Sequence, residues 1–167
     1  MRRRRGFSLL ELLAAVILIS AFALFLMDRL AFYQEVAEKA NVEFTIARLR
    51  SALRIQMATL IAQGRMREFP LLEQQNPMEW LEERPANYRV VSGNAAPEPG
   101  FWQFNTDDRT LTYWVMHGND FQPDQSGNKR IRLRVKAVDA SVGSPNEARK
   151  MAVSVRMELL EPYVWLK

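Results

Sequence analysis

Arg2-Arg3-Arg4-Arg5-Gly6-Phe7-Ser8-Leu9-Leu10-Glu11-Leu12 is the stretch that decides the fold, because a long apolar run begins inside it. From Phe7 to Met27, all residues except Ser8, Glu11 and Ser20 are apolar. At about 1.5 Å rise per residue, a helix over this run measures about 31 Å, close to the thickness of a bilayer's hydrocarbon core. The sequence therefore predicts a membrane-spanning helix over residues 7–27, to which the rest of the chain is attached.

The charges around this run predict its orientation. Four arginines precede it, whereas residues 28–43 hold two basic and four acidic residues. Cytoplasmic flanks of membrane spans are rich in Lys and Arg, so we expect a cytoplasmic N-terminus and an exported remainder. The chain holds 23 Lys and Arg against 19 Asp and Glu, so the four leader arginines account for the whole net charge of +4. The charge thus indicates orientation rather than nucleic-acid binding. The absence of cysteine excludes disulfides and thiolate metal sites.

Two ordinary interpretations of the run leave Glu11 unexplained. A secretory signal peptide has a shorter apolar segment of about 7–15 residues and a small-residue cleavage site, whereas bulky Phe25, Leu26 and Met27 end this one. A plain membrane anchor fits the length. A carboxylate near the centre of a membrane helix costs about 2.5 kcal/mol or more and is a functional-site hypothesis by default. Alternatively, Glu11 reaches the headgroups or lies near the positive helix N-terminus.

The segment Gly6-Phe7-Ser8-Leu9-Leu10-Glu11, followed by an apolar helix, resembles the type IV prepilin N-terminus, which type IV pilins and type II secretion pseudopilins share. The resemblance implies that prepilin peptidase cuts between Gly6 and Phe7, removes residues 1–6 and methylates the new N-terminal Phe7. It also implies that Glu11 pairs with the N-terminal ammonium of a neighbouring subunit when helices pack into a filament core. Two charges buried in that core without partners would be strongly disfavoured.

The resemblance further implies the location and the partners of the chain. The expected location is the bacterial inner membrane, with a single span and a periplasmic C-terminal domain, and later a pilus or pseudopilus. The expected partners are prepilin peptidase, other pilin or pseudopilin subunits and the inner-membrane assembly platform. The chain departs from many pilins in having Asp28 where the family's helix commonly has a proline, which predicts less tendency to kink there.

The helix is predicted to continue well past the membrane span. No Gly or Pro occurs between Phe7 and Gln63, and Gly64 is a suitable C-cap with Pro70 soon after. Residues 28–63 form an amphipathic second half of a helix of about 57 residues, or about 86 Å. We expect it to pack on a sheet, and a coiled coil is the alternative. The apolar residues recur at three- and four-residue spacing: Leu30, Tyr33, Ala37, Ala40, Phe44 and Ala47, joined by Val42, Ile46, Leu49, Leu53, Met57 and Leu60. The charged residues are expected to fill the other faces of the helix: Glu35, Glu38, Lys39, Glu43, Arg48, Arg50 and Arg54.

Residues 64–167 predict an exported domain with an antiparallel sheet. Residues 64–86 form a connection with a helical turn capped by Asn76 and begun by Pro77. Strand patterns follow at residues 88–91, 101–104, 110–115, 130–136 and 151–159, with a hairpin turn over residues 105–109. The fold class is therefore α+β: a long helix whose second half is covered by four or five antiparallel strands, as in the pilin fold. The hairpin resembles the second and third strands of several minor pilins and pseudopilins.

Residues able to catalyse a reaction or to bind a metal are sparse. His117 is the only histidine and is expected in a loop, and no nucleophile motif is present. The chain is therefore predicted not to be an enzyme. Major pseudopilins of type II secretion have a calcium site in a late loop, and calcium favours oxygen-rich loops. Asp107 and Asp108, and Asp120 and Asp124, are candidates for such a site, with solvated turns as the alternative. No other cofactor is expected.

Residues 130–136 alternate apolar and basic, with Arg130, Arg132, Arg134 and Lys136 on one face. Arginines beside aromatic residues can bind nucleic acid. The alternative is a solvated strand face with cross-strand acidic partners such as Glu158. The leading functional hypothesis is a structural subunit of a type IV pilus or a type II secretion pseudopilus. The alternative is a DNA-uptake or adhesion minor pilin that binds through this basic face.

Overall fold

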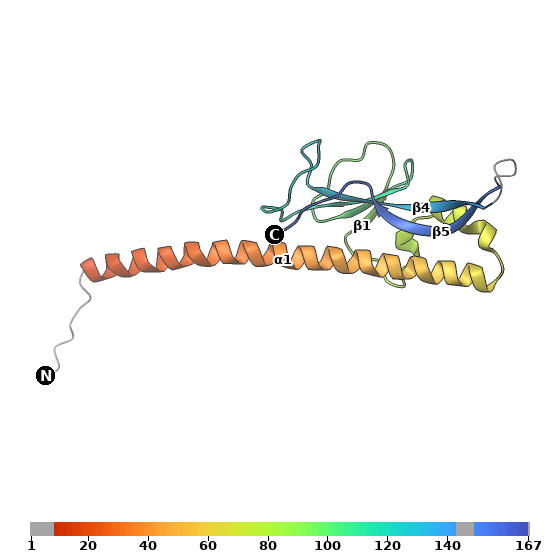
Figure 1. Ribbon diagram of the computed structural model, residues 1–167. Helices are drawn as coiled ribbons and strands as arrows, with labels where there is room; N and C mark the ends of the chain where they lie inside the picture. Colours follow the sequence, from red (N-terminus) through yellow and green to blue (C-terminus); the bar gives the residue numbers. More distant parts are fainter. Residues whose placement is uncertain (1–8, 143–148, 167) are drawn as a thin grey trace.

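The computed structural model describes residues 9–142 and 149–166 of this chain. Gly6 and Phe7, and with them the expected cleavage point, lie outside the described residues. The described part consists of one long helix, two short 3-10 helices and a five-stranded sheet (Figure 1).

Helix α1 spans Leu9–Ala62 and is continuous through Asp28. Its first half projects away from the rest of the molecule (Figure 1), and none of its residues from 9 to 34 is buried. The helix is capped, as predicted, by Gly64, whose φ of 68° lies in the left-handed region. The N–H of Gly64 donates to the carbonyl of Ile61 at 3.0 Å, and the N–H of Arg65 donates to that of Leu60 at 2.8 Å. These two bonds form the Schellman cap that satisfies the last carbonyls of a helix.

The apolar residues of the second half of α1 divide into two faces. One face lies under the sheet and includes Val42, Ile46, Leu49 and Leu53, all buried. The other face is exposed, and we call it the exposed seam: Tyr33, Ala37, Ala40, Phe44, Ala47, Ser51, Ile55 and Ala58. The predicted packing against a sheet is correct for the first set only, because one sheet can cover only one face of a helix.

The sheet is made of β1 (Tyr88–Val91), β2 (Trp102–Asn105), β3 (Thr110–Trp114), β4 (Arg130–Val142) and β5 (Arg149–Leu159), in that spatial order. The pairs β2–β3, β3–β4 and β4–β5 are antiparallel, as predicted. The pair β1–β2 is parallel, so the expectation of a wholly antiparallel sheet was wrong. Residues 92–101 form a connection long enough to return the chain to the starting end of β1, which a short hairpin turn cannot do.

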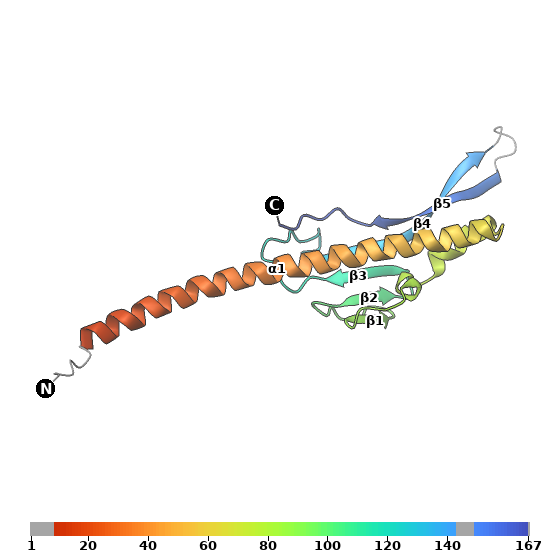
Figure 2. The same cartoon turned by 90° about the horizontal axis from the view of Figure 1, so that it is seen from below.

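The core lies between the sheet and the second half of α1. The predicted β2–β3 hairpin places Trp102 opposite Tyr113 and Phe104 opposite Leu111, and all four side chains are buried. Ile131, Leu133 and Val135 of β4 extend the same face, and Val155 and Met157 extend it on β5. Figure 2 shows that β1 to β3 lie on one side of α1, while β5 and the C-terminal segment lie on the other.

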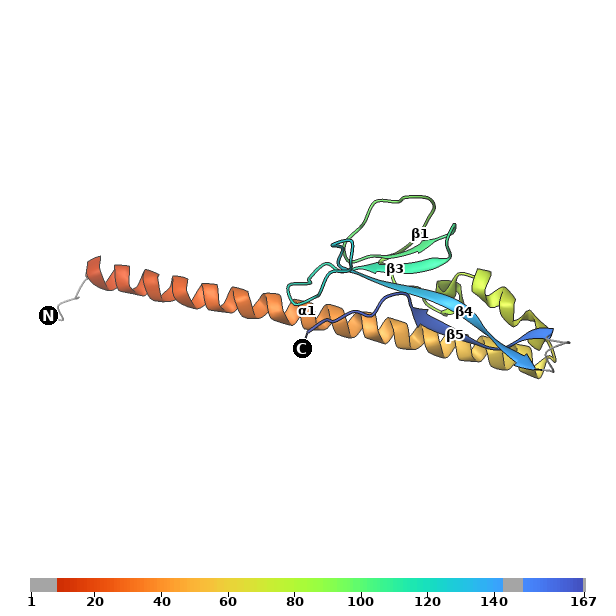
Figure 3. The same ribbon diagram turned by 45° about the horizontal axis from the view of Figure 1, so that its top comes forward.

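Two 3-10 helices connect α1 to the sheet. η2 (Pro77–Trp80) is the predicted turn, and the side chain of Asn76 accepts a bond from the N–H of Met78 at 3.1 Å. η1 (Met66–Gln74) was not predicted, because Pro70 within it argues against a helix. η1 packs against β4 and β5 near the end of α1 (Figure 3). There the Glu73 carboxylate accepts a hydrogen bond from the N–H of Ala137. Ala137 lies on the part of β4 that extends past the end of β3, so Glu73 takes the place of a neighbouring strand for this N–H.

Candidate functional site

Glu11 lies near the start of α1 on an exposed, apolar stretch of helix. Its neighbours Leu9, Leu10, Leu12 and Leu13 are all largely exposed. α1 contains a stretch that is long and apolar enough to cross a membrane, by length and composition. A helix that is apolar all round, with none of its side chains buried in its own fold, requires a lipid or protein partner.

The joint between α1 and the domain begins at Glu35, whose side chain is only 1% exposed. Its carboxylate accepts three hydrogen bonds: from the N–H of Asn119 at 3.1 Å, from the N–H of Asp120 at 2.9 Å and from the indole N–H of Trp165 at 2.9 Å. Donors of this kind replace the water that a buried carboxylate loses. Glu35 therefore fastens the loop after β3 and the C-terminal segment to the helix.

Glu38, one turn further along, holds the same loop. Its carboxylate accepts bonds from the N–H of Met116 and the N–H of His117, both at 2.7 Å, and from the hydroxyl of Tyr113 at 2.9 Å. Nδ1 of His117 lies 2.9 Å from the same carboxylate. Burial, reinforced by the hydrogen bond to Glu38 and by its charge, raises the pKa of the Tyr113 hydroxyl, which therefore remains protonated as a donor.

The C-terminal segment is held at the same level of the helix. Nζ of Lys39 donates to the carbonyl of Trp165 at 2.7 Å, and the ring of Trp165 packs edge-on against Phe121 with centroids 5.4 Å apart. Phe121 and Tyr163 stack with centroids 6.0 Å apart. The loop after β3 and the chain's last segment thus form one layer over residues 35–39 of α1.

The expectation that Glu35 and Glu38 belong to the charged, solvated faces of the helix was wrong. Both lie on the face that packs on the sheet. The sequence contained a signal for this. Glu35, Glu38 and Val42 are separated by three and four residues, and Leu49 follows seven residues after Val42, so all four lie on one face of a helix. The partners of the two carboxylates lie 75 or more positions away, and no local pattern connects such distant residues.

Residues 1–27 match the family model described as the prokaryotic N-terminal methylation motif. The similarity lies in the N-terminal segment, which carries a methylation motif of the prokaryotic type. No curated protein and no solved structure matches the chain. The match covers the predicted Gly6–Phe7 cleavage point, Glu11 and the first part of α1.

The basic face of residues 130–136 is largely engaged within the domain. Arg130 donates from Nε to Asp124 at 2.6 Å, with its guanidinium over the ring of Trp114, and Arg132 pairs with Glu161. Arg134 donates to the carbonyl of Asp108 at 3.0 Å rather than to Glu158, which pairs with Arg156. Lys136 is exposed. The carboxylates beside Arg130 and Arg132 neutralise much of the charge that phosphates would need, which favours the solvated-face alternative.

The four aspartates named as calcium candidates do not form a metal-binding group in the described part of the chain. Within the described residues, no group of three or more acidic or histidine side chains has a geometry that could hold a metal ion. Asp107 accepts a bond from the N–H of Gly93 at 2.7 Å, and Asp108 caps the N–H of Thr110 at 3.0 Å. Carboxylates that accept bonds from nearby backbone N–H groups are typical of solvated turns, the alternative to a calcium site.

Asp124 organises the loop before β4. Burial works against its charge, but bonds from the N–H of Asn128 at 2.9 Å, from Arg130 and from the N–H of Ser126 at 2.8 Å outweigh burial. Together they hold the pKa of the Asp124 carboxyl below its usual range.

Asp124→Ala is expected to lower the free energy of unfolding by about 1–3 kcal/mol near neutral pH. Because the folded-state pKa is depressed, this contribution is complete above the unfolded-state pKa of about 3.9 and disappears as the pH falls through the lower folded-state value. Urea unfolding of the full chain in detergent, at a series of pH values, measures the effect. Asp120→Ala removes an exposed carboxylate nearby and is the control. A loss that grows toward acid pH contradicts the prediction.

Proposed function

We propose that this chain is a structural subunit of a type IV pilus or a type II secretion pseudopilus, and that its N-terminal helix is its assembly element. The observation that carries the proposal is the methylation motif at residues 1–27, joined to a helix in which none of residues 9–34 is buried by its own domain. A helix of this kind is stable in a membrane and, after extraction, in a bundle of similar helices.

The exposed seam supports assembly along the whole length of α1. Tyr33 and Phe44 are each 64% exposed, and alanines lie between them at heptad-like spacing. This face is free of charged residues from Tyr33 to Ala58 and continues the apolar surface of the first half. Small residues at such spacing allow two helices to approach closely. The helix can therefore pack against neighbours beyond the bilayer without disturbing the sheet on its other face.

Processing and topology follow from the same proposal. Prepilin peptidase cuts between Gly6 and Phe7 on the cytoplasmic side, and Phe7 becomes the methylated N-terminus. The domain of residues 64–167 is periplasmic, held away from the membrane by the helix. Its partners are other pilin or pseudopilin subunits and the inner-membrane assembly platform. The chain acts through assembly rather than catalysis.

Replacing Gly6 by a bulky residue is expected to block processing. Gly6→Leu places a branched side chain beside the bond to be cut, so the product should keep its leader of six residues. Co-expression with prepilin peptidase, followed by intact mass measurement of the full chain, tests this. Arg3→Ala, which changes the leader without touching the cleavage point, is the control. Equal processing of the Gly6 variant and the wild type would refute the proposed maturation.

A further inference from the structure

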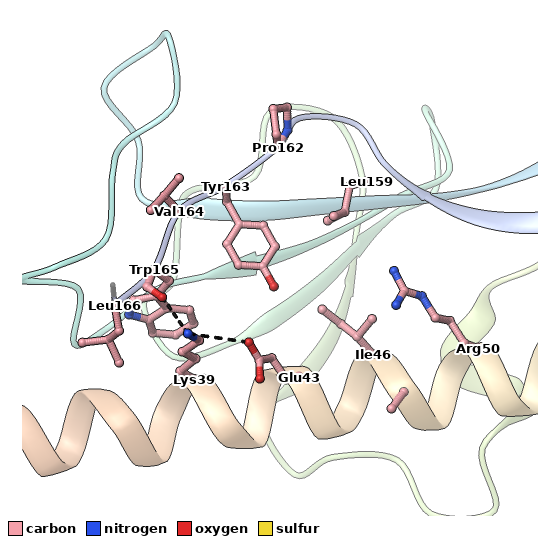
Figure 4. A pocket seen from close by; sticks show the side chains of 11 residues that line it. Lys39, Glu43, Ile46, Arg50, Leu159, Pro162, Tyr163, Val164, Trp165 and Leu166 are labelled. Carbon is pink, nitrogen blue, oxygen red and sulfur yellow. Dashed lines mark hydrogen bonds and ion pairs between the residues drawn. The ribbon is translucent and has the colours of Figure 1, made fainter.

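A groove lies between α1 and the C-terminal segment and encloses about 670 Å³ (Figure 4). Its walls are mostly apolar, with Ile46 and Ala47 on the helix and Leu159, Tyr163 and Val164 above them. An apolar surface with charged residues at its rim is typical of an interaction site. The charges at this rim therefore indicate what kind of partner the groove fits.

Three charged side chains line the groove: Lys39, Glu43 and Arg50. Nζ of Lys39 lies 3.9 Å from the carboxylate of Glu43 and donates to the carbonyl of Trp165 at 2.7 Å, so the charges of Lys39 and Glu43 largely neutralise each other. Arg50 is exposed, and within the described residues its guanidinium has no hydrogen bond or ion pair. The groove therefore has one positive charge in excess, and this charge lies at Arg50.

The sequence around Arg50 explains why this charge has no partner. No Asp or Glu occurs from residue 44 to residue 67, so the helix offers Arg50 no carboxylate at three- or four-residue spacing. Above the helix, Glu158 and Glu161 lie close in sequence to the residues of the groove, but each of them pairs with another arginine. The positive charge of Arg50 is therefore available to a molecule that enters the groove.

The hydroxyl of Tyr163 is a second donor in the groove. Figure 4 shows this hydroxyl directed toward α1, while the guanidinium of Arg50 extends from the helix toward it. Burial raises the pKa of the Tyr163 hydroxyl, the charge of Glu43 raises it further, and the charge of Arg50 opposes both. The hydroxyl therefore stays protonated, and it has no hydrogen-bond acceptor within the part of the chain that the structure describes.

We propose that the groove binds an acidic segment of a different protein. A carboxylate of that segment accepts bonds from the Arg50 guanidinium and the Tyr163 hydroxyl, and an apolar side chain beside it packs against Ile46 and Val164. The excess charge selects a carboxylate over a cation, and the apolar walls select a carboxylate with an apolar neighbour. The inference goes beyond the proposed function and does not depend on filament assembly.

A different protein is a better source of this carboxylate than a second copy of the chain. Most acidic side chains in the described residues already accept a hydrogen bond or form an ion pair within their own domain. A second copy would therefore have to give up contacts of its own fold to supply most of its carboxylates.

Binding of a fluorescently labelled synthetic peptide to the full chain in a nonionic detergent tests the proposal. The probe is Gly-Ser-Leu-Asp-Leu-Asp-Leu-Ser-Gly, and the matched neutral peptide has Asn in place of Asp. Fluorescence anisotropy, with micelles alone as the blank, should show tighter binding of the acidic peptide. Arg50→Gln is expected to weaken this binding about tenfold and Tyr163→Phe about threefold, since each removes a donor to a charged group. Glu43→Gln removes a like charge and should strengthen it.

Arg67→Gln is the matched control, because it makes the same charge change at an exposed residue of η1 that does not line the groove. Equal binding of the acidic and neutral peptides overturns the proposal, and so does an equal loss in Arg67→Gln and Arg50→Gln. If Arg50→Gln leaves peptide binding unchanged but lowers the self-association of the full chain, a second copy occupies the groove and the proposal is wrong. The Glu11 variants test filament assembly separately, so failure of one proposal leaves the other intact.

Discussion

Replacement of Glu35 by alanine is expected to lower the free energy of unfolding by about 3 kcal/mol or more. The substitution leaves three donors without their acceptor: the buried indole N–H of Trp165 and the partly buried N–H groups of Asn119 and Asp120. Each such donor costs about 1–3 kcal/mol when it loses its partner in a buried place. The loop after β3 and the C-terminal segment should separate from α1, so the amides of Asn119 and Asp120 should lose protection against hydrogen exchange.

Two further variants separate the joint from general effects of substitution on the helix. Glu35→Gln keeps the shape and one acceptor oxygen but points an N–H₂ group at a donor, so we expect an intermediate loss of about 1–2 kcal/mol. Glu43→Ala removes an exposed carboxylate from the same helix and should cost about 0–1 kcal/mol. Denaturant unfolding and hydrogen exchange of the full chain in detergent give both measurements. An unchanged exchange rate at Asn119 and Asp120 in Glu35→Ala would show that the joint is not held by this carboxylate.

Glu11→Ala is expected to lower filament assembly by about a hundredfold or more while leaving processing and the folded domain intact. In the proposed assembly, the carboxylate of Glu11 receives the N-terminal ammonium of a neighbouring subunit, and the substitution leaves that cation in an apolar bundle. Removing one partner of a buried ion pair costs about 3–5 kcal/mol, and each 1.4 kcal/mol corresponds to a factor of ten.

Comparison of several variants of the first half of α1 isolates the effect of the Glu11 charge on assembly. Glu11→Gln removes the charge with little change of shape and should behave like Glu11→Ala. Ser20→Ala changes another polar residue of the same apolar run and should assemble normally. Crosslinking in membranes reports assembly, and intact mass reports cleavage after Gly6. Normal assembly of the Glu11 variants would show that the motif serves processing alone.

The elements of this chain could be predicted because each rests on a local pattern. The helix follows from more than fifty residues without Gly or Pro, and its end follows from Gly64 at the left-handed position. The η2 cap and the β2–β3 hairpin follow from Asn76-Pro77 and from the turn residues at 105–109. The parallel pairing of β1 could not be predicted, because nothing near Tyr88 indicates which way a ten-residue connection returns. η1 was missed since Pro70 contradicts a helix locally, whereas packing on β4 and β5 stabilises it.

By itself, the sequence determined the address and the anchor that we propose for this chain. In the proposed function, the leader arginines, Gly6, Phe7, Glu11 and the apolar run act through position along the chain and through partition into a bilayer, and neither requires a fold. Only the tertiary structure decided which helix residues are buried and which remain exposed. It placed Glu35 and Glu38 under a loop that lies about eighty residues away in the chain, and it left Phe44, Arg48 and the groove beside Tyr163 at the surface. The physical reason is that a sheet covers one face of a helix, and the choice of face depends on contacts distant in sequence.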